Sequence, residues 1–218
     1  QELQAGMRSF PSPDGAGASA EAFLCDQLEN GAGYASELTK SHRLEELIRQ
    51  LSPHDSNTIA AAWLERYQRL GHASPHSIEC DTSCNRCLRE YGNIGYHGLL
   101  DWRLALDMAR IAESRDVKVD LVTDWRPGVD NPWKSVTDAC ARVLRKLRAV
   151  DDGTMNGMRV FRNPATVHPG ILVLRHPLWT DDHPEWLSTV SELAAQGDDL
   201  PIRAVNPFRI IRRPSDSL

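Results

Sequence analysis

Three of the five cysteines in the chain, Cys80, Cys84 and Cys87, lie within eight residues. They are separated by three and then two residues in a polar stretch, where a hydrophobic core would not require thiols. Thiolates held so close together favour a tetrahedral cation that prefers soft ligands, which indicates zinc first and an iron–sulfur cluster second. Because a structural zinc ion normally has four protein ligands, the sequence predicts a further donor outside this triplet.

The fourth metal ligand has several candidates. We expect His97 first, because it follows Cys87 by ten residues and precedes a predicted helix. The alternatives are His76, His72 and Cys25. The sequence thus predicts structural Zn2+ held by Cys80, Cys84, Cys87 and His97.

Other chemistries are compatible with clustered cysteines. A catalytic zinc site needs a general acid or base, and the chain does not pair a His-x-Glu motif with its Cys-x-x-Cys motif in the deaminase manner. The same three-cysteine spacing occurs in radical S-adenosylmethionine enzymes, but Arg86 stands where that family usually has an aromatic residue. A thiol role without a metal is the last alternative. A structural site is the favoured interpretation, since nothing near the cysteines resembles an active site.

Length and charge exclude several classes of protein. A chain of 218 residues can form one sizeable core or two small ones. Its formal charge of −5 argues against a surface that binds nucleic acid throughout, so any DNA contact must be a local basic patch. The odd number of cysteines favours a reducing compartment. No apolar run approaches the roughly 20 residues that span a bilayer, so we expect a cytoplasmic protein without a membrane partner.

The first half of the chain is expected to be mostly helical. Short strands are predicted at 2–10 and 22–25, with a polar loop at 11–20 between them. Because strand 2–10 has no partner upstream, we expect the chain to be the C-terminal piece of a longer polypeptide. Helices are predicted at 42–51, 59–70 and 99–111. In the third helix Leu100, Leu104, Met108 and Ile111 should face inward, leaving Arg103, Asp107 and Arg110 as a solvated, ion-paired face.

The second half alternates strands and helices. Strands are predicted at 117–122, 158–161, 170–174, 202–205 and 208–211, and helices at 132–150 and 184–197. Cys140 lies on the apolar stripe of the first of these helices and is expected in the core. The fold class is therefore α/β (α+β), a mostly helical zinc-knuckle half followed by a small α/β half. The expected domains are residues 1–115 and 116–218.

Two segments carry a resemblance to a known family. Residues 24–34 read LCDQLENGAGY, and residues 80–106 combine CDTSCNRCLREYGNIGYHG with LLDWRLAL. Together they resemble the C-terminal MrfA-type zinc-binding (MZB) module of bacterial superfamily 2 DNA helicases, which also occurs in helicases and companion subunits of antiphage islands such as DISARM and Druantia. The resemblance covers residues 1 to 115. Cys80, Cys84 and Cys87 match the metal cysteines of the family, whose members often use four.

The resemblance implies a function through a partner. In the family this module lies behind an ATP-driven DNA translocase and braces it or guides the strand that leaves it. This sequence has no Gly-x4-Gly-Lys-Ser/Thr motif and no Gly-Lys pair, so we do not expect the chain alone to hydrolyse ATP. The predicted function is a zinc-stabilised accessory module of an ATP-dependent DNA helicase or translocase, in DNA repair or antiphage defence, with a helicase motor domain or subunit as partner.

Other functions and the DNA contacts stay open at this point. The alternatives are a metal-dependent enzyme, either a radical iron–sulfur enzyme or a zinc-dependent nucleic-acid hydrolase, and a protein-interaction adaptor that does not contact DNA. Basic residues near the cysteines and on the helix at 132–150 are the candidates for DNA contact, although a solvated helix face is the favoured interpretation of the second group. These residues are Arg86, Arg89, Arg103, Arg142, Arg145 and Lys146.

Overall fold

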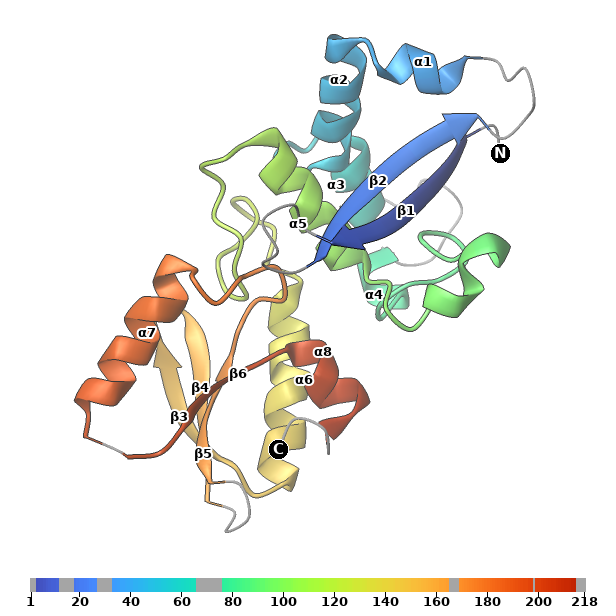
Figure 1. The fold of residues 1–218 in the computed structure, drawn as a ribbon. Coiled ribbons are helices and arrows are strands. Elements are labelled where there is room, and N and C mark those ends of the chain that lie inside the picture. Colours follow the sequence, from blue (N-terminus) through green and yellow to red (C-terminus); the bar gives the residue numbers. More distant parts are fainter. Residues whose placement is uncertain are drawn as a thin grey trace. The chain divides into compact units, whose positions relative to one another are not determined.

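A computed structural model of the chain describes residues 3–11, 18–26, 33–65, 76–164, 169–197 and 199–214 (Figure 1). The chain forms two compact units, residues 1–50 and 51–218, and each is described by itself. Helices and sheets occur together, so the predicted α+β class is confirmed. The predicted boundary at residues 115 and 116 stays a prediction. Among the described residues, no helix has both the length and the apolar character needed to cross a membrane.

The first unit is built on a hairpin. Strands β1 (Leu3–Pro11) and β2 (Ala18–Asp26) pair antiparallel, and helices α1 (Tyr34–Leu38) and α2 (Ser41–Leu51) follow. The opening strand therefore pairs with a downstream strand, and the second strand is longer than predicted because residues 18–20 of the expected loop belong to it. A Cβ atom on Gly6 would lie 2.3 Å from the Phe23 ring, so a glycine lets this aromatic side chain cross the opposite strand.

The second unit begins with short helices around the cysteines. These are α3 (Ile59–Glu65), α4 (His76–Glu79), the 3-10 helix η2 (Tyr91–Tyr96) and α5 (Trp102–Glu113). The predicted helix at 59–70 is confirmed as far as residue 65, and its remainder lies outside the described residues. A small core joins α3, the cysteine loop and α5 and consists of Ala60, Leu64, Cys80, Trp102, Leu106 and Trp125.

Helix α5 forms where it was predicted, but its expected faces are wrong. Met108, expected inside, is 60% exposed, and Ile111 is exposed as well. Asp107, expected on a solvated face, is fully buried, and Arg103 and Arg110 are also buried. The charged side of this helix therefore faces the protein.

Every carboxylate oxygen of Asp107 has a partner, which is the condition under which a buried charge is tolerated. Its Oδ1 accepts a hydrogen bond from Arg110 Nη1 at 2.7 Å, and its Oδ2 accepts one from Trp133 Nε1 at 2.6 Å. His176 Nε2 lies 3.1 Å from the same Oδ2. The Leu178 N–H donates a hydrogen bond to His176 Nδ1, so the ring proton is on Nε2. This Nε2–H group donates a hydrogen bond to Asp107. Asp107 thus joins α5 to the α/β part of the unit.

The α/β part has three layers. Its sheet has the order β3-β4-β5-β6, with the last pair parallel and the others antiparallel. The strands are β3 (Val150–Met155), β4 (Met158–Asn163), β5 (Gly170–Leu174) and β6 (Ile202–Val205). Helix α7 (Pro184–Ala195) connects the parallel pair, while α6 (Trp133–Lys146) and α8 (Pro207–Arg212) cover the opposite face (Figure 1).

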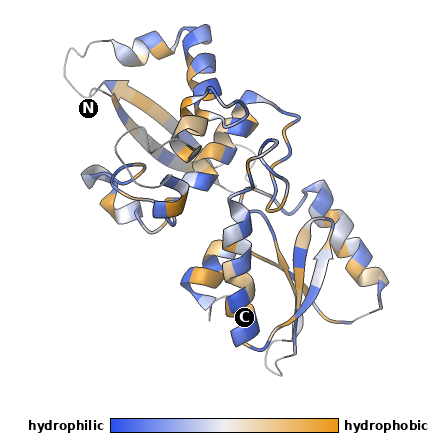
Figure 2. Cartoon of the chain, turned by 180° about the vertical axis from the view of Figure 1, so that it is seen from behind, coloured by the Kyte–Doolittle hydropathy of each residue, from blue (hydrophilic) through white to orange (hydrophobic). Residues whose placement is uncertain are grey.

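Alternate residues of the strands serve two separate cores. Phe161, Leu172 and Leu174 pack against α6 and α8. Val160, Ile171 and Val173 pack with Trp186 and Leu193 of α7. The helices correspondingly show hydrophobic and hydrophilic residues alternating along their length (Figure 2). Cys140 on α6 is fully buried, which confirms the expectation that it is a core residue.

Two predicted strands are wrong. Residues 117–123 form an irregular loop, because the Asp120 carboxylate accepts hydrogen bonds from the backbone N–H groups of Val122 and Thr123 and so fixes a turn. Residues 208–211 belong to α8, whose first turn is capped by the Asn206 side chain accepting from Phe208 N. Strand β3 was not predicted, because Asp151-Asp152-Gly153 resembles a turn; a register shift between Asp151 and Gly153 accommodates it.

Candidate metal centre

Four side chains bring potential metal-ligand atoms together in the second unit. They are His76, Cys80, Cys84 and Cys87, and one donor atom from each lies within 4.8 Å of the others. The Sγ atom of Cys87 is 3.9 Å from the Sγ atoms of both Cys80 and Cys84. The Nε2 atom of His76 is 3.8 Å from the Sγ atom of Cys84.

These distances fit a tetrahedral ion. With metal–sulfur bonds of about 2.3 Å and tetrahedral angles, two sulfur ligands of one zinc ion lie about 3.8 Å apart. The separations of 3.9 Å between the sulfurs agree with that value. One imidazole and three thiols are also a donor set found in closed zinc sites. The cluster could therefore hold a metal ion with its present geometry.

Two local structures supply the four donors. His76 opens α4, and Cys80 follows its last residue, one helical turn later, with Cys80 N donating to His76 O at 2.9 Å. Cys84 and Cys87 lie in a tight turn in which Cys87 N and Arg89 N both donate to Cys84 O at 3.0 Å. Helical and turn spacing thus direct two pairs of donors toward one point.

Backbone N–H groups point at two of the sulfurs. Cys84 N lies 3.1 Å from Cys87 Sγ, and Arg86 N lies 3.4 Å from Cys84 Sγ. Burial opposes ionisation of Cys84, but the N–H of Arg86 and the neighbouring thiols bring the pKa of Cys84 below its usual value. Hydrogen bonds of this kind favour the thiolate, which is the form that binds metals.

The other two thiols behave differently. Burial, followed by the proximity of Cys87 and Cys84, raises the pKa of Cys80 to about 12. Burial also raises the pKa of Cys87. Three thiolates in contact repel each other in a partly buried site, so a bound dication is what would allow all three to ionise together.

The start of α5 holds the backbone between the first two cysteines. Trp102 Nε1 donates to Cys80 O at 3.0 Å, and Trp102 N donates to Thr82 O at 2.9 Å. Arg103 Nη1 donates to the carbonyl between them, Asp81 O, at 2.6 Å. Three successive carbonyls of the cysteine loop are therefore fixed by two residues of one helix. Such support around the ligands keeps a metal site in its binding geometry.

The predicted fourth ligand lies elsewhere. His97 Nε2 is 2.8 Å from Asn93 Oδ1 and 3.0 Å from Glu90 O, and it is not in the cluster. His76, an alternative at the sequence level, occupies the fourth position instead. Cys25 lies in the other unit, with its Sγ 3.6 Å from Gln4 O, and His72 lies outside the described residues.

The six predicted DNA-contact residues have different surroundings. Arg103 is buried, and its guanidinium also donates to Pro132 O at 3.2 Å, so it is engaged within the protein. Arg86 is exposed and pairs with Glu79, while Arg89 is half-buried with its Nε donating to Ser83 Oγ. On α6, Arg142, Arg145 and Lys146 are all exposed, and Arg145 pairs with Asp151 at 2.5 Å.

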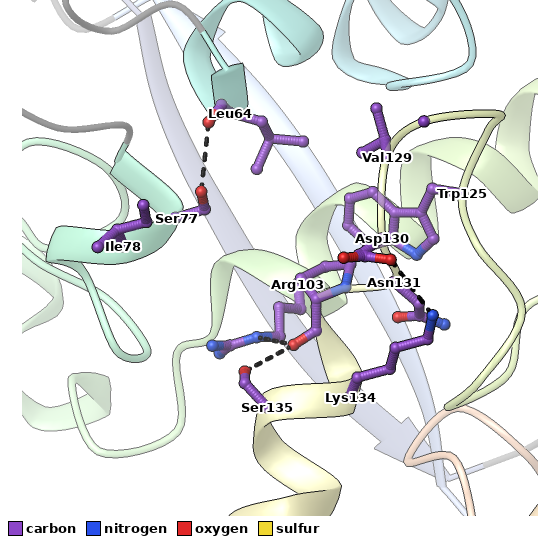
Figure 3. Close-up of a pocket in the computed structure, with 12 residues that line it drawn as sticks. Leu64, Ser77, Ile78, Arg103, Trp125, Val129, Asp130, Asn131, Lys134 and Ser135 are labelled. Carbon is purple, nitrogen blue, oxygen red and sulfur yellow. Dashed lines mark hydrogen bonds and ion pairs between the residues drawn. The ribbon is translucent and has the colours of Figure 1, made fainter.

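A cavity of about 590 Å³ is lined by residues of α3, α4 and α5, by the loop at 125–132 and by the start of α6 (Figure 3). The charged and hydroxyl groups that line it form hydrogen bonds or ion pairs with other protein groups. Arg103 contacts Pro132 O, Lys134 pairs with Asp130 at 3.4 Å, and Ser77 Oγ donates to Leu64 O at 3.2 Å. These groups thus serve the fold, whereas the buried Nε1 of Trp125, which also lines the cavity, has no hydrogen-bond partner among the described residues.

Comparisons with known proteins give one loose link. No family model matches the chain, and no solved structure matches it. An alignment 137 positions long, which covers 59% of the chain, shows 26% identity to the Druantia protein DruE of Escherichia coli (strain UMEA 4076-1). The chain spans only 6% of the length of that protein. Part of this chain is therefore similar to a segment of a much larger Druantia protein.

Proposed function

We propose that the chain is a zinc-stabilised accessory module of an ATP-dependent DNA helicase or translocase, in DNA repair or antiphage defence. The observation that carries the proposal is the convergence of His76 with the three cysteines, and the similarity to a Druantia protein supports it. In this proposal residues 1–115 are the helicase-associated zinc-binding module and residues 116–218 a C-terminal α/β subdomain. The motor belongs to another domain or subunit, and both act in the reducing cytoplasm, where thiols persist.

The donor set favours a structural zinc ion over a catalytic metal. Four protein donors fill a tetrahedral shell and leave no position for a substrate or an activated water. A radical iron–sulfur site would use three cysteines and keep one iron open, yet here His76 lies where that opening would be. When bound, zinc would supply binding free energy that is also folding free energy.

The same geometry explains how the metal would organise the module. His76 and Cys80 would anchor α4, and Cys84 and Cys87 would anchor the following turn. The hydrogen bonds from Trp102 to the cysteine loop would then fix the start of α5 to the metal-bound loop. DNA contact is assigned to the exposed residues Arg86, Arg142, Arg145 and Lys146 and to the half-buried Arg89, with Arg103 as a positioning residue.

Metal analysis tests the proposal with a matched pair of histidine variants. We expect one zinc ion per chain in freshly purified, colourless protein. His76→Ala should weaken zinc binding, measured by competition with a chromophoric chelator, by at least about tenfold, whereas His97→Ala should leave it unchanged. The absence of metal, a brown protein, or equal effects of the two variants would overturn the assignment.

A further inference from the structure

A second hollow, of about 790 Å³, lies between α8 and the end of η2 with the residues that follow it. Gly95, Gly98 and Leu99 form one wall, and α8 forms the other with Phe208 and its arginines. Arg212 Nη1 donates to Gly98 O and so connects the two walls. Helix α8 itself packs beside α6, at the red end of the chain in Figure 1.

The hollow gathers positive charge in a chain that is acidic as a whole. The sequence from Pro207 to Arg213 contains three arginines and no acidic residue, although the net charge of the chain is −5. All three arginines line the hollow and are exposed. The side chains of Arg209 and Arg213 form no hydrogen bond or ion pair with the described residues, whereas Arg159 and Arg175 each pair with an aspartate. Unpaired cations that share one hollow attract an anionic ligand.

Arg212 presents a flat, prearranged surface. Its guanidinium lies over the Phe208 ring, 5.0 Å from the ring centroid, and the bond to Gly98 O fixes its orientation. The Phe208 ring is supported in turn by Trp133, with centroids 5.3 Å apart. Nucleic-acid bases stack on guanidinium planes held in this way.

The glycine wall leaves room for such a ligand. A Cβ atom on Gly95 or Gly98 would meet nothing within 4 Å, and neither residue has a left-handed backbone conformation. The fold therefore does not require glycine at these two positions. Beside them, Leu99 is 73% exposed and gives the hollow an apolar surface.

We propose that this hollow binds single-stranded DNA, with Arg209 and Arg213 contacting phosphates and a base stacking on the Arg212 guanidinium. The proposal rests on the proposed function, in which a motor supplies the single strand. A duplex hides its base faces, so it would use the arginines but leave the planar and apolar surfaces empty. An acidic peptide without aromatic residues, such as polyglutamate, would satisfy the arginines but has no ring to place on the guanidinium.

Fluorescence anisotropy with a labelled oligo-dT strand and the metal-loaded full chain tests this site. Arg209→Ala/Arg213→Ala should weaken binding at least about tenfold and reduce the salt dependence of log K by about 1.4, the value for two phosphate contacts on a single strand. The control Arg49→Ala/Arg115→Ala removes the same charge from exposed positions outside the hollow and should change affinity less than about twofold.

A steric variant removes no charge. Gly98→Leu should fill the hollow without backbone strain and weaken binding to a similar extent. Four results would each overturn the site. Two concern the variants: equal losses of affinity in the arginine variant and its control, or unimpaired binding by Gly98→Leu. Two concern the ligand: equal affinity for a matched duplex, or displacement of the strand by polyglutamate at equal charge. Zinc content, measured on the same samples, reports on the metal centre separately, so failure here is distinguishable from failure of the proposed function.

Discussion

The cysteine region and the sheet region of the second unit are stabilised in different ways. Among the described residues, six buried hydrophobic residues form the core around the cysteines, whereas the cores on the two sides of the sheet contain twelve and seven. The cysteine region instead has four converging donor atoms and hydrogen bonds from α5 to the loop carbonyls. In the proposed function, a bound zinc ion would stabilise the region with the smaller described core, while the sheet would need none.

The largest expected effect is a selective loss of structure on metal removal. A strong chelator should abolish amide protection in residues 76–113 and leave residues 158–174 protected, since structural zinc contributes on the order of 10 kcal/mol in small zinc modules. Hydrogen exchange with mass spectrometry measures both regions in one sample. Uniform loss of protection, or no loss at all, would remove the distinction between the two regions.

The next largest effect is expected where the two regions meet. Asp107→Ala should lower the free energy of unfolding by about 3–5 kcal/mol, because it leaves Arg110 and the Trp133 N–H buried without their shared partner. Urea unfolding followed by tryptophan fluorescence measures the change. Asp138→Ala, which breaks an exposed pair with Arg159, is the control and should cost less than about 1 kcal/mol. Similar costs for both variants would contradict a buried connection.

A smaller effect is expected from the carboxyl group that begins α5. Burial raises the pKa of Asp101 to about 6, while the nearby Arg103 partly offsets this. A raised pKa means that the folded chain favours the protonated carboxyl group, so its contribution to the free energy of unfolding is fully present at low pH. That contribution is lost as the pH rises through about 6. The loss amounts to about 3 kcal/mol at most.

Asp101→Asn keeps an N-cap acceptor for Arg103 N but cannot ionise. The free energy of unfolding of the variant should therefore rise, relative to that of the unmodified chain, as the pH increases from 5 to 7.5. Urea unfolding with excess zinc at both pH values checks this. A stability difference that does not change with pH would show that Asp101 titrates normally in the folded chain.

Much of the fold could be predicted because its signals are local. Apolar spacing identified α2, α6 and α7, and the alternation of strands and helices indicated the α/β part. The faces of α5 could not be predicted in this way, because the partners of Asp107 are Trp133 and His176, 26 and 69 residues further along the chain. Without knowledge of those distant partners, charged residues on one side of a helix predict a solvent-exposed face.

The candidate site was predicted in part for a similar reason. The spacing of the three cysteines predicts a metal site, and the structure brings their sulfur atoms together. His76 carries a local signal, since positions i and i+4 of a helix share one side and His76 precedes Cys80 by four residues. His97 lacks that relation to any cysteine, and Asn93 holds its ring instead. The arginines of α8 were missed because residues 208–211 resemble a strand and the facing wall comes from residues 95–99.

Helix α5 has a mechanical consequence for the second unit. Arg103 holds the cysteine loop and Asp107 holds Trp133, and the two residues are four positions apart on one side of the helix. A rotation of α5 about its axis by a single residue, about 100°, would break both attachments together. A displacement of the cysteine loop would therefore be transmitted along α5 to Trp133 and so to the core that packs on the sheet.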